Sequence, residues 1–432
     1  MSHRPVHRFL IIGFSFFAFS AAPVQASEMD ILLRKLVEKG ILTQEEAREV
    51  KEEVRQEVAQ EKEAVAAAPV QAKKPVQEDL PGWVRNTAWA GDLRLRHETQ
   101  FRKPAEDRSR ERFRLRFGFT TKPWDPLEIG VRLATGASGD PVSTNQSFTS
   151  TFDKKSVFID KAYVAYTPWK GISLTGGKME IPFYAPTQIV WDSDVTPEGA
   201  AIQLRSAGPL PLFQENLPTT PFLNIGAFQI SELNGDAGDP AMFGVQLGKE
   251  TQLPGGFTWT SAVAYYEMTG VEDKRISDIT QAGAPSGNST AGPAGAPVYR
   301  YDYDVVDFLG KLEIPDILGR PVALIGNGVF NPGAEENNSA WQAGVKVGKV
   351  SGKLGSWELS YFYKKVEPDA VLGAITDSDF GGGGTNHQGH SVGARIGLNK
   401  YADLGVTYHN AREVNGAEND VDTLQIDSNL KF

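Results

Sequence analysis

The sequence predicts an all-β transmembrane barrel of about sixteen antiparallel strands, preceded by a short α-helical or coiled-coil segment. Three observations support this fold class: a leader at the start of the chain, strands with one apolar and one polar face, and connections of alternating length. After the leader, the sequence has no run of the roughly 18 apolar residues that a membrane-spanning helix needs. Any membrane insertion would therefore take place through strands.

The composition excludes several classes of protein. The 432 residues carry a formal net charge of -10 and include no cysteine. The arginines are interleaved with apolar residues instead of forming a basic run, so nucleic acid is not an expected partner. Without cysteine there is neither a disulfide framework nor a thiolate metal site, which suits a chain that crosses an oxidising periplasm.

Residues 1–26 predict a secretory signal peptide. The segment starts with basic residues, continues through an apolar run from Phe9 to Ala22, and ends with small residues at Val24 and Ala26. The apolar run is too short to span a bilayer comfortably. We expect cleavage after Ala26.

Residues 27–66 predict a helical periplasmic segment. Gly40 interrupts it, and Thr43 followed by Glu46 predicts a capping box. The apolar spacing beyond Ala47 suits a short coiled coil, and it equally suits a solvated single helix. Such a segment could serve as an oligomerisation stalk or as a tether that contacts peptidoglycan. Residues 67–82 are rich in proline and alanine and predict a linker, so the barrel domain would span 83–432.

The stretch 89–121 predicts the first two strands of the barrel. Apolar and charged residues alternate through 89–98 and 112–119, the period that places successive side chains on opposite faces of a sheet. Arg112, Arg114 and Arg116 then form a row of like charges spaced by roughly 7 Å, which a dry interior would not tolerate. We expect the arginine face to meet water or anions, and the apolar face to meet lipid.

Alternating segments continue to the end of the chain. The later strands are predicted near 127–134, 156–167, 172–180, 200–206, 222–231, 241–251, 257–267, 304–314, 321–331, 340–350, 356–366, 390–399, 403–412 and 422–432. One set of connections is short: 122–126, 167–171, 252–256, 315–320, 351–355 and 399–403. The other set is mostly longer and more polar: 102–110, 136–155, 181–198, 268–303, 367–389 and 413–421. Only 207–221 breaks the alternation. Short periplasmic turns and long external loops are typical of outer-membrane barrels.

The last predicted strand carries an assembly signal. Leu424, Ile426, Leu430 and Phe432 share one parity, with Ser428 as a small departure. The chain ends on an aromatic residue, so Phe432 is predicted to be the terminal signal that barrel assembly machinery recognises.

Four segments together carry a family resemblance: LLRKLVEKGILTQEEA at 32–47, GDLRLRHE at 91–98, RFRLRFGF at 112–119, and the block 159–201. With them the chain resembles the proteobacterial putative-porin family, which are sixteen-stranded outer-membrane porins with an N-terminal periplasmic coiled-coil segment. The resemblance implies a water-filled channel for passive diffusion of small hydrophilic solutes in the outer membrane of a Gram-negative bacterium. It also implies a homotrimer.

The resemblance further implies that a loop folds into the lumen as a constriction. Carried over onto this sequence, that places Trp191, Asp192, Asp194 and Glu198 at the constriction.

The pore wall is expected to be cationic. Its predicted pore-lining residues are Arg94, Arg96, Arg112, Arg114, Arg116 and Arg132. An acidic loop on the opposite side would create a transverse field, and the arginines would give a mild anion preference. The alternative is that the arginines pair with carboxylates such as Asp92, Glu98, Asp160 and Glu358, and only hydrate the wall.

Other functions compete with diffusion. A substrate-specific channel for phosphate-like anions would use the arginines as a ladder. A barrel that tethers the envelope or mediates adhesion would transport nothing. A secreted soluble β-protein would not be inserted in a membrane. No enzyme activity, cofactor or metal is predicted: His387 and His390 lack a third ligand at metal-binding spacing, and no nucleophile is paired with a base.

Overall fold

The computed structural model describes residues 35–53, 56, 81–206, 208, 217–233, 235, 238–280, 283–416 and 419–432, and it forms two compact units, Met1–Asp79 and Leu80–Phe432. In the first unit, helix occupies 35–38 and 44–53. The Thr43 backbone N–H donates to Glu46 Oε2 (2.7 Å), and the Thr43 hydroxyl accepts from the Glu46 N–H (3.3 Å). The predicted capping box is therefore confirmed. The predicted signal peptide and nearly all of the predicted linker lie outside the described residues.

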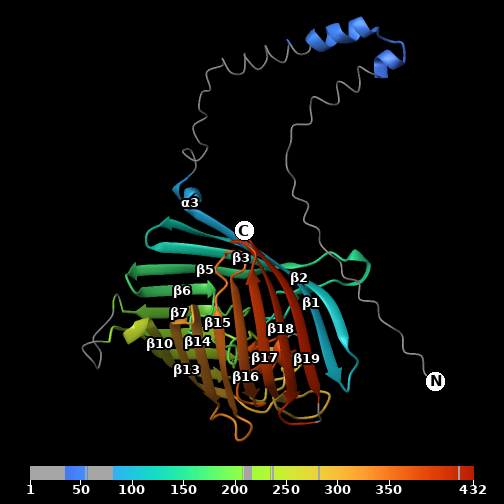
Figure 1. Ribbon diagram of the computed structural model, residues 1–432. Coiled ribbons are helices and arrows are strands. Elements are labelled where there is room, and N and C mark those ends of the chain that lie inside the picture. The colour runs from blue at the N-terminus through green and yellow to red at the C-terminus, as the bar shows by residue number, and fades with distance from the viewer. Residues whose placement is uncertain are drawn as a thin grey trace, which may run out of the picture. The chain divides into compact units, whose positions relative to one another are not determined.

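The second unit is a closed antiparallel barrel of sixteen strands (Figure 1). Each strand pairs with its neighbour in the sequence, and β1 pairs with β19 to close the barrel. The predicted number and order of strands are confirmed. The barrel strands are β1 (Thr87–Lys103), β2 (Arg108–Trp124), β3 (Leu127–Thr135), β5 (Val157–Trp169), β6 (Ile172–Lys178), β7 (Glu198–Arg205), β8 (Thr219–Gln229), β9 (Ala241–Leu253), β10 (Phe257–Thr269), β13 (Tyr303–Ile317), β14 (Arg320–Phe330), β15 (Ser339–Gly348), β16 (Trp357–Val366), β17 (His387–Gly397), β18 (Ala402–Glu413) and β19 (Asp420–Lys431).

Short elements decorate the barrel. The two-residue strand β4 (Gln146–Ser147) pairs with β2, and β11 (Thr290–Ala291) pairs with β12 (Val298–Tyr299). The others are single turns of helix: α3 (Gly82–Arg85), η2 (Ser150–Phe152), η3 (Pro254–Gly256), α4 (Ile276–Ile279), η4 (Gly373–Ile375) and η5 (Phe380–Gly382). Within the described part of the chain, no helix has the length and apolar character to cross a bilayer.

The two faces of the wall differ in polarity. On β9, Leu247 is 64% exposed on the outside, whereas its neighbour Gln246 is 0% exposed and faces the lumen. The same alternation exposes Val263 on β10 and Ile426 on β19, and it buries Thr260 and Gln425 inside. An apolar outside around a polar inside is favourable only where the outside meets an apolar solvent.

The connections confirm the alternation of lengths, with one correction. Residues 125–126, 170–171 and 318–319 are turns at one end of the barrel, and most of the longer loops lie at the other end. The connection between β7 and β8 is the exception that the sequence predicted, since it is long and lies at the end with the short turns. The connection at 102–110 was predicted to be long, and this is wrong, because β1 extends to Lys103 and β2 begins at Arg108. The Arg102 N–H donates to Asp107 (3.1 Å), and the Arg102 Nε donates to the Glu106 carbonyl (2.8 Å), which closes a tight turn.

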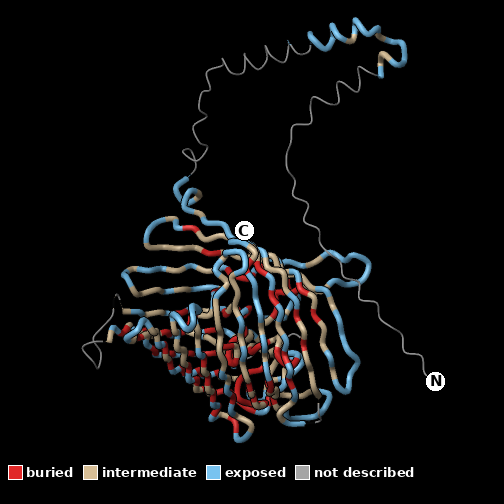
Figure 2. Tube along the Cα trace, viewed as in Figure 1, coloured by how far each residue is buried: buried red, intermediate tan, exposed pale blue. Residues whose placement is uncertain are grey.

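Three of the long loops fill part of the lumen with an apolar core. We call them the loop plug: the β6–β7 loop (179–197), the β10–β13 loop (270–302) and the β16–β17 loop (367–386). Their buried side chains pack on inward residues of the wall. Figure 2 shows buried positions along the chain inside the barrel. The loop residues are Met179, Phe183, Ile189, Val190, Trp191, Val195, Val271, Ile276, Tyr299, Ala370, Val371 and Leu372. The water-filled space is therefore narrower than a bare sixteen-strand wall would enclose.

Candidate functional site

The arginine rows of β1 and β2 face each other across one pair of strands. In the register of this pair, Arg94 lies opposite Arg114, and Arg96 lies opposite Arg112. Like charges directly opposite one another destabilise a sheet unless other groups compensate them. The wall therefore requires carboxylates from elsewhere at this point.

Carboxylates of the wall supply part of this compensation. Asp92 accepts from both Arg114 (2.8 Å) and Arg116 (2.8 Å). The buried Glu98 carboxylate forms ion pairs with Arg110 and, at 3.2 Å, with Arg112. On the other neighbouring strand, Asp427 lies opposite Arg96 and binds it at 2.7 Å.

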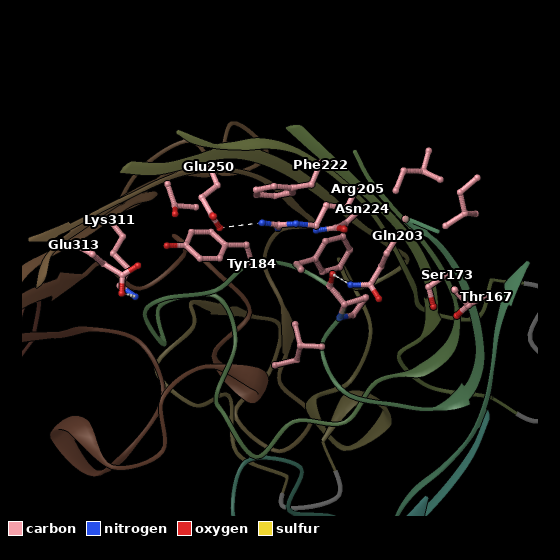
Figure 3. Close-up of a pocket in the computed structure, with 17 residues that line it drawn as sticks. Thr167, Ser173, Tyr184, Gln203, Arg205, Phe222, Asn224, Glu250, Lys311 and Glu313 are labelled. Carbon is pink, nitrogen blue, oxygen red and sulfur yellow. Dashed lines mark hydrogen bonds and ion pairs between the residues drawn. The ribbon is translucent and has the colours of Figure 1, made fainter. Parts of the chain in front are cut away.

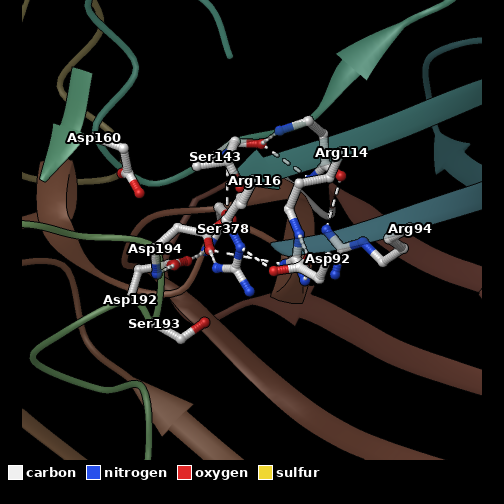
Figure 4. A network of polar contacts seen from close by, with 12 residues as sticks. Asp92, Arg94, Arg114, Arg116, Ser143, Asp160, Asp192, Ser193, Asp194 and Ser378 are labelled. Carbon is white, nitrogen blue, oxygen red and sulfur yellow. Dashed lines mark hydrogen bonds and ion pairs between the residues drawn. The ribbon is translucent and has the colours of Figure 1, made fainter. Parts of the chain in front are cut away.

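The loop plug supplies the rest. Asp194 of the β6–β7 loop lies 3.3 Å from the Arg116 guanidinium and 3.9 Å from that of Arg114 (Figure 4). Asp379 of the β16–β17 loop lies 3.1 Å from the Arg96 guanidinium. Burial alone would raise the pKa of Asp379, but the guanidinium groups of Arg96 and Arg94 outweigh it and hold that pKa well below its usual range. These two loops are thus joined to the arginine wall by ion pairs.

The predicted pore-lining arginines lie together on one side of the lumen. They differ in whether a carboxylate pairs with them. Arg132 on β3 pairs with Asp160, so five of the six have carboxylate partners in the ion pairs just described. Arg94 is the exception among the described residues: it donates to the Asn145 Oδ1 (2.7 Å), and its Nε is buried without a hydrogen-bond partner. Most arginines of this wall are therefore paired with carboxylates, as in the alternative given under the sequence analysis.

The predicted constriction residues divide into three groups. Asp192 and Asp194 lie in the lumen within the β6–β7 loop. Trp191 is 3% exposed and packs between Phe228 and Tyr266, so it belongs to the apolar core of the plug and not to a pore surface. Glu198 shares the exposed parity of Ala200 and Ile202 on β7, and its carboxylate pairs with Lys178 (2.9 Å).

Asp192 fastens two loops of the plug to each other. Its carboxylate accepts from the N–H groups of Asp194 (2.8 Å) and Ser378 (2.9 Å), and its own N–H donates to the Ile375 carbonyl (2.8 Å). Burial and, next, the nearby Asp377 carboxylate raise the pKa of Asp192 to about 8. Asp192 is thus largely protonated at neutral pH, and the acidic charge opposite the arginines comes from Asp194 and Asp379.

Two cavities lie on either side of these loops. The outer cavity, of about 930 Å³, is lined by residues of the β3–β5 loop (136–156) and of the plug. The inner cavity, of about 600 Å³, lies toward the end with the short turns and is lined by side chains of β6 to β10 and β13 and by residues 181–184 of the loop plug (Figure 3). Polar and apolar side chains together line both cavities, and the polar ones offer contacts to hydrated solutes.

Several residues of the site were not predicted from the sequence. Asp379 and Asp427 compensate the arginine wall, and Lys364 pairs with Asp377 in the β16–β17 loop. The signal that could have revealed the plug is the apolar content of its loops, such as AVL at 370–372 in a connection otherwise rich in glycine and aspartate.

The chemistry of this site is electrostatic. Among the described residues there is no group of three or more His, Cys, Asp or Glu side chains that could hold a metal ion. His387 contacts the Gly383 carbonyl, whereas His390 binds the Tyr361 hydroxyl on the outer face, so the two imidazoles point to opposite sides of β17.

A closed barrel with an apolar outside, a polar lumen and loops folded into that lumen defines an outer-membrane channel of the porin class. The chain belongs to the family described as "Putative porin", whose sequence model matches residues 100–294 and 320–432. No curated protein matches the chain.

The fold also occurs in a solved structure at low sequence identity. The high-pH structure of OprB from Pseudomonas putida superposes with a TM-score of 0.52 and 11% identity, and the match covers 80% of this chain and 94% of OprB. OmpT of Vibrio cholerae, described as a trimer, has a TM-score of 0.46 and 9% identity over 80% of this chain and 99% of its own. OmpF of Salmonella typhi, solved with daunomycin, has a TM-score of 0.46 and 12% identity over 80% and 97%.

Proposed function

We propose that this protein is a passive diffusion channel for small hydrophilic solutes and ions. The observation that carries the proposal is the polarity of the wall, with charged and amide side chains inside and apolar side chains outside. The apolar core of the loop plug narrows the path, so we expect a smaller conductance than an unobstructed barrel of this strand number would give.

Conductance across a planar bilayer tests the proposal. The purified full-length protein, shown to be folded by heat-modifiable migration on a gel, is expected to insert and to produce discrete ion-conducting steps. A folded barrel that never conducts would favour the tethering or adhesion alternative, and pull-down with peptidoglycan would then support it. A protein that stays soluble without detergent would contradict both the channel function and the tethering function.

Ion selectivity is expected to be weak, with a mild preference for anions. Most guanidinium groups of the wall are compensated, and Arg94 supplies the cationic charge that has no carboxylate partner in the described structure. In a salt gradient, the reversal potential should indicate a slight excess of anion flux. Arg94→Gln should remove that excess, and clear cation selectivity of the unmodified protein would contradict it. Saturable conductance with phosphate would instead indicate a phosphate-like anion channel.

The proposal includes the expected partners and location. The barrel lies in the outer membrane with lipid around it, it assembles as a homotrimer, and the segment 27–66 lies in the periplasm, where its helix contacts peptidoglycan. Barrel assembly machinery recognises Phe432, which pairs by backbone with Gly91 (2.9 and 3.0 Å) at the end of the barrel with the short turns. Crosslinking of the purified protein tests whether it is a trimer. A variant whose mature chain begins at Val70, and therefore lacks the segment 27–66, tests whether that segment contacts peptidoglycan.

A further inference from the structure

We propose that the inner cavity is a binding site for a neutral polyhydroxylated solute of about hexose size. This inference rests on the proposed diffusion function and assigns a solute class to one place along its path. The cavity has a volume of about 600 Å³, within the range of roughly 300–1,000 Å³ found for small-molecule sites.

The charges that line this cavity compensate one another. Arg205 on β7 pairs with Glu250 on β9 (2.9 Å), and Lys311 pairs with Glu313 on β13 (2.7 Å). These four are the charged residues of the lining, two cations and two anions. A solute with a net charge would meet its counter-charge already paired, and it would have to break that pair to bind.

The same ion pairs suit hydroxyl groups. The Arg205 side chain is 50% exposed and that of Glu313 is 50% exposed, so donor and acceptor groups both face the water of the cavity. A sugar hydroxyl donates one hydrogen bond and accepts others, as a hydroxyl of serine does. Hydrogen bonds to charged groups are roughly twice as strong as those between neutral groups. Adjacent hydroxyls can therefore bind both members of one pair without separating them.

Tyr184 gives the cavity a fixed aromatic surface. Its backbone N–H donates to the Gln246 Oε1 (2.7 Å) and its carbonyl accepts from the Gln246 Nε2 (3.0 Å), and Gln246 is 0% exposed. Asn224 donates to the same Gln246 oxygen (2.9 Å), which fixes the amide in turn. The barrel wall thus holds the backbone of Tyr184 in place before any solute arrives, which reduces the entropic cost of binding.

The ring of Tyr184 lies between the two ion pairs (Figure 3). Its neighbour Phe222 contacts it edge-on, with 6.2 Å between the ring centroids. The Phe222 ring is 6% exposed and lies under the Arg205 guanidinium, so Tyr184 is the aromatic surface that a solute can reach. The apolar C–H face of a sugar ring would pack on it while its hydroxyls bind the charged groups.

The test compares glucose with glucuronate, which keeps the sugar ring and has a carboxylate in place of the C6 hydroxymethyl group. Each is added to both sides of a planar bilayer that holds the full-length protein, and the reduction of single-channel current is measured. Glucose is expected to block in a saturable way, with glucuronate requiring about a ten-fold higher concentration for half-block. Equal block by both solutes would overturn the proposal.

Two variants separate specific binding from crowding of the pore. Tyr184→Ala should raise the half-blocking concentration of glucose about ten-fold, whereas Tyr184→Phe, which keeps the ring, should retain the block. Glu250→Gln leaves Arg205 without its carboxylate partner, and it should invert the preference, so that glucuronate blocks better than glucose. A Tyr184→Ala channel with unchanged glucose block would contradict the site. Absence of any conductance would contradict the diffusion function itself, whereas conductance without a glucose effect would contradict only this inference.

Discussion

The Arg96 guanidinium lies 3.1 Å from the Asp379 carboxylate, and this contact ties the β16–β17 loop to the first strand of the barrel. Arg96 is 4% exposed and also binds Asp427 on β19 at 2.7 Å. One buried cation therefore joins the closing pair of strands to a loop of the plug. This connection makes the position of the plug sensitive to single charges.

Asp379→Asn should loosen the plug. Arg96 keeps Asp427 but loses its partner in the loop, and loss of one partner of a buried polar group costs about 1–3 kcal/mol. We expect a larger or noisier single-channel current and a lower temperature of the heat-modifiable transition. Asp273→Asn, in the exposed part of the β10–β13 loop, is the matched control and should leave both unchanged. An Asp379→Asn channel that matches the control would show that the ion pair does not hold the loop.

The conductance should depend on pH through Asp192. Its pKa is raised from 3.8 to about 8 by burial and by Asp377. The folded protein therefore retains a proton that the unfolded chain has lost, and this contribution to stability falls as the pH rises from about 4 to about 8. Above pH 8 the ionised carboxylate lies buried near Asp377, so the two loops that it fastens should separate more readily.

Single-channel recordings from pH 6 to pH 10 measure this effect. We expect the current of the unmodified protein to rise above pH 8, and that of Asp192→Asn to stay constant over the same range. A rise that persists in Asp192→Asn would assign the transition to another group.

Gly91 and Phe432 should act together in assembly. A Cβ atom at Gly91 would lie 2.5 Å from the Phe432 ring and 2.9 Å from the Arg116 carbonyl, so the glycine makes room for the terminal aromatic. Gly91→Ala is expected to lower the folded fraction after refolding, as is Phe432→Ala. At Gly326 on β14, a Cβ atom meets nothing within 4 Å. Gly326→Ala is therefore the matched control, and an equal loss of folding in both glycine variants would contradict a specific role for the contact.

Arginines of the wall should differ in their structural cost. Arg116 binds Asp92 and Asp194, whereas Arg94 binds only the Asn145 side chain among described residues. Arg116→Gln should lower the temperature of the heat-modifiable transition by several degrees, because Asp92 and Asp194 each lose one of their two guanidinium partners and keep only Arg114. Arg94→Gln should change that temperature little while it shifts the reversal potential. The reverse order of stabilities would contradict the pairing.

Much of the barrel could be predicted because a strand repeats every two residues. The alternation of Leu93 with Arg94 determines which face each side chain occupies, and the same rule extended to Phe432 gives the order and number of strands. The tight turn at 104–107 was missed because charged residues at the ends of β1 and β2 have the composition of a loop.

The interior was harder to predict, because it depends on contacts between residues far apart in the sequence. Nothing local to Asp379 indicates that Arg96 is its partner, and Trp191 has the same local sequence whether it lines a pore or packs in a core. The arginine row indicated that anions were required, but strand periodicity says nothing about which loops supply them. Glu198 is the first residue of β7, so it follows the strand and not the acidic loop, and it borders the outer cavity beside Lys178.

For a channel of the proposed kind, lipid surrounds the apolar face of the barrel and water reaches the enclosed face. Because the chain has no cysteine, single cysteines can test it directly. Glu313→Cys lies on the inner face, and Leu247→Cys lies on the outer face, where the leucine is 64% exposed. In membranes, a charged, membrane-impermeant thiol reagent should label Glu313→Cys and lower its conductance, and it should leave Leu247→Cys unlabelled. Equal labelling of the two positions would contradict the claim, since it would mean that water meets both faces of the barrel.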